Sequence, residues 1–434
     1  MKNCSLLSLL SLLLAAALSL TAASAAPQQT EVREIPERVV VVSGDSSKLH
    51  KDIVAIIFSP ADIHFHDPSA PRFLFLDRKG KIAFGIGGNI YATAAYNFAG
   101  SSSTGSDFIP STLPVPANPD QRAALQFTAR HSTIFFQLAG HAGRLGTFSA
   151  YIQTDFTGGS GSSRHLTLVQ AYVKIGDVTA GLARSTFVDA ASIPTVDTRG
   201  PAGINDAKNV LVQYSPQFSS GWSGAISLEA SPAGISNGLH TRTISQRVPD
   251  LPVYVKFAWG NSGNHVRLSA ILRNLCYRDA LTGRRRYTTG YGVSFSSYTA
   301  LGAGFGLYSI ATFGQGIGSY VADTKNLNYD LIPSARNAGR LFAPRIFAHA
   351  AGLRYDFSPR VFATAAWGQV TLYDRGALDG STTYRTGKYF SVNAFYNLFE
   401  NCLLGLEYAR GSRRNFDGSV GTGNRIMTAV RYSF

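Results

Sequence analysis

Apolar and polar residues alternate in short segments along residues 81–434 of the chain. In the segment 253–259, VYVKFAW, the odd positions are apolar, and the even positions include Tyr254 and Lys256. Such alternation predicts β-strands with one apolar and one polar face. The same pattern recurs in three later segments, 264–277, 388–399 and 424–434.

Turn residues divide this region into about sixteen predicted strands, so the expected fold class is all-β. The strands are expected at 82–98, 121–138, 145–157, 164–175, 177–185, 207–215, 221–230, 251–259, 264–277, 287–299, 301–314, 345–357, 360–373, 388–399, 402–411 and 424–434.

Alternation alone fits both a soluble sandwich and a membrane barrel, but the lengths of the connections separate the two. With few exceptions, long and short connections alternate along the chain. The long ones include 231–250 and 315–344, and the short ones include 176–177 and 400–401. Short periplasmic turns and long external loops are typical of outer-membrane barrels. We therefore predict a transmembrane antiparallel β-barrel of about sixteen strands over residues 81–434.

The first 25 residues have the pattern of a secretory signal peptide. Lys2 precedes an apolar run, 6–20, and Ala23-Ser24-Ala25 forms a small-residue cleavage site. The pattern predicts export, with the barrel in the outer membrane of a Gram-negative cell. Residues 26–80 are charged and lack long alternation, and we expect an N-terminal periplasmic segment there, with short strands at 39–42 and 53–58.

The composition is basic, with 40 Lys and Arg against 26 Asp and Glu. An exported chain does not meet nucleic acid, so the charge favours anionic lipid or anionic solutes as partners. His64, His66 and Asp67 offer metal donors, but a His pair without a third ligand favours a structural role. No spacing indicates a catalytic triad or a phosphate-binding loop, so we expect no enzyme activity, no metal and no cofactor.

The stretch 181–209 is the most specific part of the chain. Pro194 and Pro201 cannot donate to a β-ladder, so the stretch leaves the sheet as the third external loop. It carries charges of both signs. An ordinary solvated loop and a pore constriction both fit it, and the constriction hypothesis names Arg184, Asp189, Asp197, Arg199 and Lys208.

At these residues the chain resembles the DcaP-like outer-membrane porins. The similar positions are Ala171-Tyr172-Val173, Gly176-Asp177, Gly181, Ser185-Thr186-Phe187, Asp189, Pro194, Thr195, Asp197 and Gly200-Pro201, with Thr128 to Ser132 and Asp155-Phe156. The resemblance implies a trimeric barrel in which an inward-folded third loop forms a basic constriction for small anions such as dicarboxylates. The chain departs from the family at Thr167 and Val169, where basic residues are usual, and it has no counterpart of the periplasmic coiled coil of some members.

The polar strand faces predict a charged, water-filled lumen. The expected lining is Arg130, Arg267, Arg273, Arg354, Arg425 and Arg431, with the acids Asp155 and Glu407. A ring of arginine beside acids passes anions and excludes apolar solutes. A barrel with an occluded lumen and a structural or surface-interaction role remains the alternative. Arg284 to Arg286 and Arg413-Arg414 are expected in external loops, where they would bind lipopolysaccharide phosphates, attract anions or be merely solvated.

Overall fold

The computed structural model describes residues 34–37, 39–44, 49–58, 64–68, 70–100, 105–116, 123–141, 143–159, 163–230, 232–260 and 263–434. The predicted signal peptide lies outside the described residues. No helix in the described ranges is long and apolar enough to cross a membrane.

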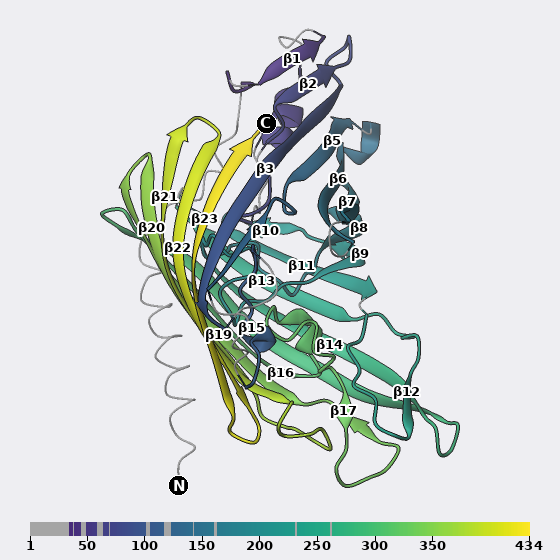
Figure 1. Cartoon of the computed structure of the whole chain (residues 1–434). Helices are drawn as coiled ribbons and strands as arrows, with labels where there is room; N and C mark the ends of the chain where they lie inside the picture. The colour runs from purple at the N-terminus through teal and green to yellow at the C-terminus, as the bar shows by residue number, and fades with distance from the viewer. Residues whose placement is uncertain are drawn as a thin grey trace.

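The described residues form a closed antiparallel β-barrel of sixteen strands (Figure 1), with β4 and β5 counted as one interrupted strand. The last strand pairs with the first, with Ile426 opposite Tyr96, and this pairing closes the barrel. The second barrel strand is interrupted at residues 129–132, which divides it into β4 and β5. The barrel strands are β3 (Ile82–Ala99), β4 (Ala124–Thr128) with β5 (Thr133–His141), β6 (Thr147–Gly158), β7 (His165–Ile175), β8 (Val178–Arg184), β9 (Lys208–Tyr214), β11 (Trp222–Ala230), β13 (Leu251–Trp259), β14 (Asn264–Asp279), β15 (Arg285–Gly302), β16 (Phe305–Gln315), β19 (Arg345–Ser358), β20 (Val361–Leu372), β21 (Tyr384–Phe399), β22 (Cys402–Asn415) and β23 (Val420–Ser433).

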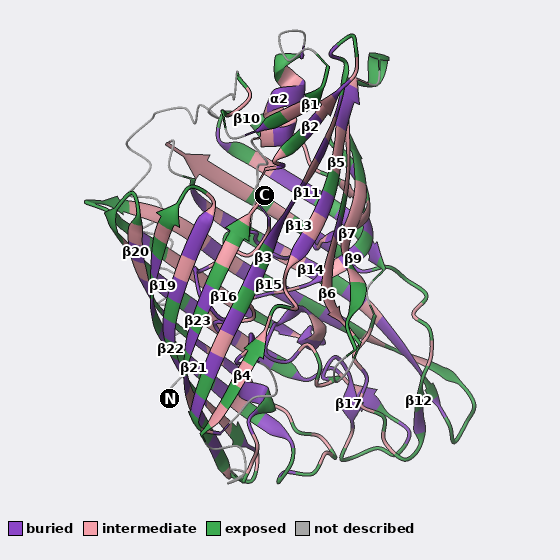
Figure 2. Ribbon diagram, turned by 45° about the horizontal axis from the view of Figure 1, so that its top comes forward, coloured by how far each residue is buried: buried purple, intermediate pink, exposed green. Residues whose placement is uncertain are grey.

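Side chains alternate between the two faces of the barrel, as the sequence pattern predicts. Figure 2 shows buried and exposed bands in turn along β21, β22 and β23. Leu406 and Tyr408 are exposed on the outer face, whereas Glu407 between them is fully buried. Apolar side chains thus cover the outer face, as contact with lipid requires. Exposed aromatic residues near the strand ends include Tyr214, Trp222, Phe305, Phe357 and Phe399 at the end with short turns, and Tyr287, Tyr291, Phe313 and Tyr373 at the other.

The predicted rule of long and short connections holds for most of the barrel, but the external connections 280–284 and 416–419 are short because their strands extend further than predicted. Short turns such as 176–177, 303–304 and 400–401 lie at one end of the barrel, and long loops leave from the other. The short elements in the connections are β10 (Gln217–Ser219), β12 (Thr241–Thr243), β17 (Ile332–Pro333) and β18 (Leu341–Phe342), with 3-10 turns at Pro110–Thr112, Gly143–Leu145 and Gly318–Tyr320.

Several external hairpins are longer than predicted. Strand β21 begins at Tyr384 and β22 runs to Asn415, because ladder pairing continues where both faces are polar and the apolar alternation has ended. Two arginine clusters expected in loops therefore lie mainly in strands. Arg285 and Arg286 begin β15, and Arg413-Arg414 belong to β22.

The N-terminal segment packs on the end of the barrel that carries the short turns. The predicted strand at 39–42 is confirmed as β1 (Val40–Ser43), which pairs in parallel with β2 (Phe73–Leu76), and β2 continues the sheet beside β3. The predicted strand at 53–58 is wrong, because this stretch forms the helix α2 (Lys51–Phe58). Ile53, Val54 and Ile57 follow a helical spacing and are buried against Ala139 of β5.

Candidate functional site in the barrel lumen

Residues 185–207, which we term loop 3, lie inside the barrel. Their backbone contacts inward side chains of strands far apart around the wall. Near one end of the loop, Thr186 N–H donates to Glu229 of β11 at 2.8 Å. Further along, Val196 N–H donates to Glu407 of β22, also at 2.8 Å, and Asn393 of β21 donates to the Pro194 carbonyl at 2.9 Å. Loop 3 therefore crosses the interior from one side of the wall to the other.

Glycines allow loop 3 to approach the wall at backbone distance. A Cβ atom on Gly368 of β20 would lie only 1.6 Å from the Ala202 carbonyl oxygen of the loop. Gly203 has a φ of +96°, which favours glycine, and a Cβ there would lie 2.2 Å from the His349 carbonyl oxygen. The path of the loop is thus fixed by steric fit as well as by hydrogen bonds.

The two predicted loop acids are buried and hold loop 3 in place. Asp189 accepts a hydrogen bond from Ser296 Oγ at 2.5 Å and pairs with His265 Nε2 at 3.0 Å. Asp197 is fully buried and accepts hydrogen bonds from the backbone N–H groups of Phe108 and Arg199. Both carboxyl groups thus bind neighbouring protein groups, and their part in a pore constriction stays a prediction.

Burial, together with the neighbouring Glu407, raises the pKa of the Asp197 carboxyl to about 8. The Asp197 carboxyl is therefore mostly protonated at neutral pH. A neutral carboxyl costs less to bury than a carboxylate, which explains how this side chain is accommodated inside the loop.

Part of the N-terminal segment also enters the lumen. Phe65 packs edge to face against Phe395 and Phe362 of the wall, with ring centroids 5.2 and 6.3 Å apart. Its N–H donates to Ser192 Oγ of loop 3 at 2.7 Å, and its carbonyl accepts from Arg431 at 2.6 Å. Residues 64–68, expected in the periplasm, thus lie against loop 3 within the barrel.

Charged side chains gather where loop 3, this N-terminal segment and the connection 316–344, which we term loop 6, meet. Arg184 Nη2 lies 2.7 Å from Asp67 Oδ2, and Lys325 Nζ lies 3.2 Å from Asp206 Oδ2. Arg184 of β8 is also opposite Lys208 of β9 in the ladder. We define the luminal charge cluster as Asp67, Arg184, Arg199, Asp206, Lys208 and Lys325.

Cations outnumber carboxylates in the luminal charge cluster by four to two. Burial opposes ionisation of Asp206, but Lys325 and Lys208 outweigh it and hold the pKa of its carboxyl well below the usual range. Burial and the nearby Arg184 lower the pKa of His64 to about 4, so this imidazole adds no charge at neutral pH. The six residues alone carry a net positive charge, and each of them remains partly exposed. Arg199 also interacts with Asp107, an acid outside the cluster.

The predicted lining arginines face inward, but most of them anchor loops. Arg267 lies 3.7 Å from the Tyr254 ring centroid and donates to the Thr186 carbonyl at 2.6 Å. Arg273 is buried between Asp250 and Asp330, at 2.9 and 3.0 Å.

The other predicted lining residues also bind nearby protein groups. Arg425 donates to the Asp107 carbonyl at 3.1 Å, and Arg431 donates to that of Phe65. Arg130 donates to the Thr157 carbonyl at 2.8 Å, and Asp155 accepts from the N–H and hydroxyl of the same residue. Arg354 pairs with Asp356 at 2.7 Å and lies 4.1 Å from the Phe362 ring centroid, while Glu407 holds loop 3.

Sequence reasoning missed the contributions of Lys325 and Asp67 to the luminal charge cluster. Lys325 is a single cation in a long loop, and no local signal in the sequence indicates that it reaches Asp206. Asp67 was considered only as a metal donor beside His64 and His66, whereas it pairs with Arg184. The useful signal in the sequence is the mixed charge of 181–209, which marks this stretch as a candidate site without naming its partners.

The family of the chain follows from a match over most of its length. Residues 117–398 match a family model described as a porin subfamily. The chain belongs to this porin family. The porin is therefore an outer-membrane channel protein and not an enzyme. No curated protein sequence matches the porin.

Solved outer-membrane proteins share the fold of this porin. The outer membrane channel DcaP of Acinetobacter baumannii has a TM-score of 0.71 at 19% identity, covering 82% of this porin and 98% of DcaP. The anion-selective porin from Comamonas acidovorans has a TM-score of 0.52 at 8% identity, and a loop-deletion mutant of OmpT from Vibrio cholerae has one of 0.51 at 9%; each covers 82% of this porin and 100% of the other chain. The resemblance to DcaP-like porins and the barrel fold expected from the sequence are thus confirmed.

Proposed function

We propose that this porin is a passive diffusion channel whose luminal charge cluster favours small anionic solutes, with dicarboxylates as the preferred class. The observation that carries the proposal is the surplus of accessible cations held within the barrel by loop 3 and loop 6. A fixed positive field in a narrow aqueous passage attracts anions and repels cations. No energy source or cofactor is required for such diffusion.

The class of solute follows from how the cations are distributed. Arg184 and Lys208 extend from adjacent positions of the wall, whereas Arg199 and Lys325 extend from loop 3 and loop 6. A solute with two carboxylates interacts with both pairs, whereas a monocarboxylate interacts with one. The resemblance to DcaP-like porins implies the same class of solute.

Conductance of the refolded protein in a planar bilayer tests this proposal. We expect stable open channels with a reversal potential, under a salt gradient, that indicates preference for anions. Absence of conductance from protein with intact barrel strands would support the alternative, an occluded barrel with a structural or surface-interaction role. Phe65 in the lumen and a cavity of only about 20 Å³ beside His64 and Asp189 are the observations that keep this alternative open.

We also propose that the porin assembles as a homotrimer through the part of the barrel wall with the shortest strands, β8 and β9. A strand needs roughly nine to eleven residues to cross the hydrocarbon core, but β8 and β9 have seven residues each. Their outward side chains include the exposed Val178, Val210 and Val212. A neighbouring copy would cover this short apolar wall, and the resemblance implies three copies. Cross-linking in detergent tests the stoichiometry, and closures of the channel in three equal steps would support it.

The outer face carries a second basic surface, which suits the phosphates of lipopolysaccharide. A groove of about 410 Å³ on the external half of β20 to β23 is lined by Gln369, Thr371, Arg385, Thr386, Lys388, Ser412, Arg414 and Val420. Three of these residues are cations on the outer face, directed away from the lumen. Arg413, by contrast, is held by the carbonyls of Ser111 and Thr382. We expect Lys388→Ala and Arg414→Ala to reduce copurified lipopolysaccharide without changing ion selectivity.

A further inference from the structure

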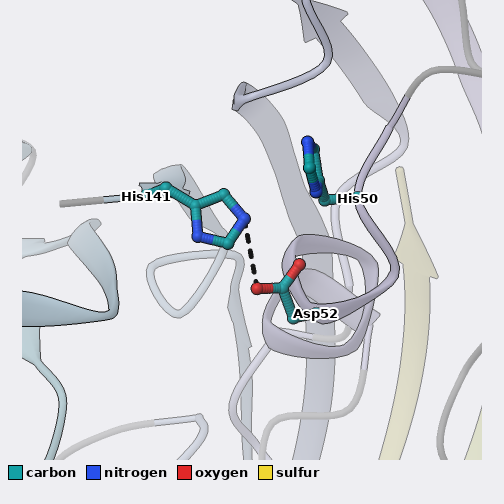
Figure 3. A group of neighbouring side chains, drawn as sticks. All are labelled: His50, Asp52 and His141. Atoms are coloured by element: carbon teal, nitrogen blue, oxygen red, sulfur yellow. Dashed lines mark ion pairs between the residues drawn. The ribbon is translucent and has the colours of Figure 1, made fainter. Parts of the chain in front are cut away.

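Two histidines and an aspartate come together where α2 packs on the barrel. His50 and Asp52 lie at the start of the helix, and His141 lies at the end of β5. One ligand atom from each residue lies within 4.8 Å of the others. Figure 3 shows the His141 ring directed at the Asp52 carboxylate, with the His50 ring beside them. Residues far apart in the sequence thus present two imidazoles and one carboxylate to a common point.

The buried nitrogen of His141 is incompletely satisfied in this cluster. Its Nε2 atom lies 3.2 Å from Asp52 Oδ2, yet within the described ranges it has no partner with hydrogen-bond geometry. The rings of His50 and His141 meet edge to face with centroids 4.9 Å apart, so both imidazoles lie beside the same carboxylate. A buried ring nitrogen without a hydrogen bond is an available ligand atom.

The scaffold beneath the cluster is rigid. Ile53, Val54 and Ile57 of α2 are buried in a core shared with β3 and β5. Gln137 of β5 also donates to the Ile56 carbonyl at 3.3 Å. Because the backbones of α2 and β5 are fixed by this packing, only side-chain rotation is needed to bring the three ligand atoms closer together.

We propose that His50, Asp52 and His141 bind a divalent transition-metal ion, with zinc as the preferred metal. Zinc takes imidazole nitrogen and carboxylate oxygen at roughly 2.0 to 2.2 Å, and three protein ligands with a water complete its tetrahedron. Magnesium and calcium prefer oxygen ligands and do not suit a set with two imidazoles. The metal ion would join the N-terminal segment to β5 and so stabilise the docking of α2 on the barrel.

Calorimetric titration of zinc chloride into the metal-stripped, full-length protein in detergent tests the site. We expect saturable binding of one zinc ion per chain and no comparable binding of magnesium. His50→Ala and His141→Ala should each weaken zinc affinity by at least about tenfold, and Asp52→Asn should weaken it less. His240→Ala, in an exposed external loop, is the matched control and should bind zinc like the unaltered protein.

Limited proteolysis provides a second readout that does not depend on channel activity. Zinc should slow cleavage around α2 in the unaltered protein and in His240→Ala but not in His141→Ala, while resistance of the folded barrel to heat in detergent verifies that each variant is folded. Absence of saturable zinc binding, or equal affinity in His50→Ala, His141→Ala and the control, would overturn the proposal. Conductance has no part in this test, so its outcome is independent of the proposed channel function.

Discussion

The Arg184 guanidinium lies 2.7 Å from the Asp67 carboxylate and so joins the barrel wall to a segment 117 positions earlier in the chain. Both side chains are largely but not fully buried, with 14% and 18% of their surfaces exposed. Asp67 thereby offsets one of the four cations in the luminal charge cluster. The N-terminal segment consequently adjusts the charge of the lumen as well as its width.

Removal of the Asp67 charge should increase the preference for anions. In Asp67→Asn the amide oxygen can still accept from the His64 N–H, but Arg184 loses its ionic partner. We expect the anion-to-cation permeability ratio to rise about twofold, as measured from reversal potentials. Asp177→Asn, in an exposed short turn, is the control. A ratio that falls in Asp67→Asn would show that Arg184 does not act on the permeating ion.

The fit of loop 3 against β20 predicts a steric variant that opens the channel. In Gly368→Ala the new methyl group would meet the Ala202 carbonyl oxygen, which cannot move without the backbone of the loop. We expect loop 3 to shift from the wall, at a cost of about 1 to 3 kcal/mol in the free energy of unfolding. Single-channel conductance should increase and become noisier.

Gly352→Ala is the matched comparison for Gly368→Ala. Its methyl group would lie 2.5 Å from Cγ2 of Ile193, so a side chain rather than the loop backbone is the first group that must shift, and we expect a smaller effect. If Gly368→Ala has the conductance and noise of the unaltered channel, the backbone contact between loop 3 and β20 is not formed.

The raised pKa of Asp197 predicts that the stability of loop 3 depends on pH. Its pKa in the folded protein is about 8, above the ordinary value of 3.8. The folded state therefore holds a proton that the unfolded state has lost between these values, so stability falls as pH rises from about 4 to about 8. We expect proteolysis of loop 3 to be faster at pH 9 than at pH 6.

Asp197→Asn should remove most of this dependence, because an amide cannot ionise and its oxygen can still accept from Phe108 and Arg199. Proteolysis rates measured at both pH values check the prediction. An equally steep pH dependence in Asp197→Asn would assign the effect to another group.

The strands were predictable because each one places apolar side chains toward lipid on one face and other side chains toward water or protein on the opposite face. The segment 251–259 was predicted with the bounds that β13 has, since apolar alternation covers its whole length. The external ends of β21 and β22 were predicted less well, because ladder pairing continues there without an apolar face. The stretch 53–58 is expected to form a short strand, but burial of one side against β5 favours a helix.

The candidate site was only partly predictable from the sequence. Alternation correctly placed Arg267 and Glu407 on the inner face, but it says nothing about what occupies the lumen. Loop 3 enters that space, where the side chains of Asp189 and Asp197 are buried and hydrogen-bonded to neighbouring groups. Long-range pairs such as Lys325 with Asp206 depend on the fold of two loops and leave no periodic signal in the sequence.

The most direct test of the account is the reversal potential of the double variant Arg184→Ala/Arg199→Ala in a planar bilayer under a salt gradient. Removal of both cations leaves Lys208 and Lys325 balanced by Asp67 and Asp206, so we expect preference for anions to be lost. Arg336→Ala, in an exposed part of loop 6, should retain it. An anion preference in the double variant equal to that of the unaltered channel would show that the luminal charge cluster does not set selectivity.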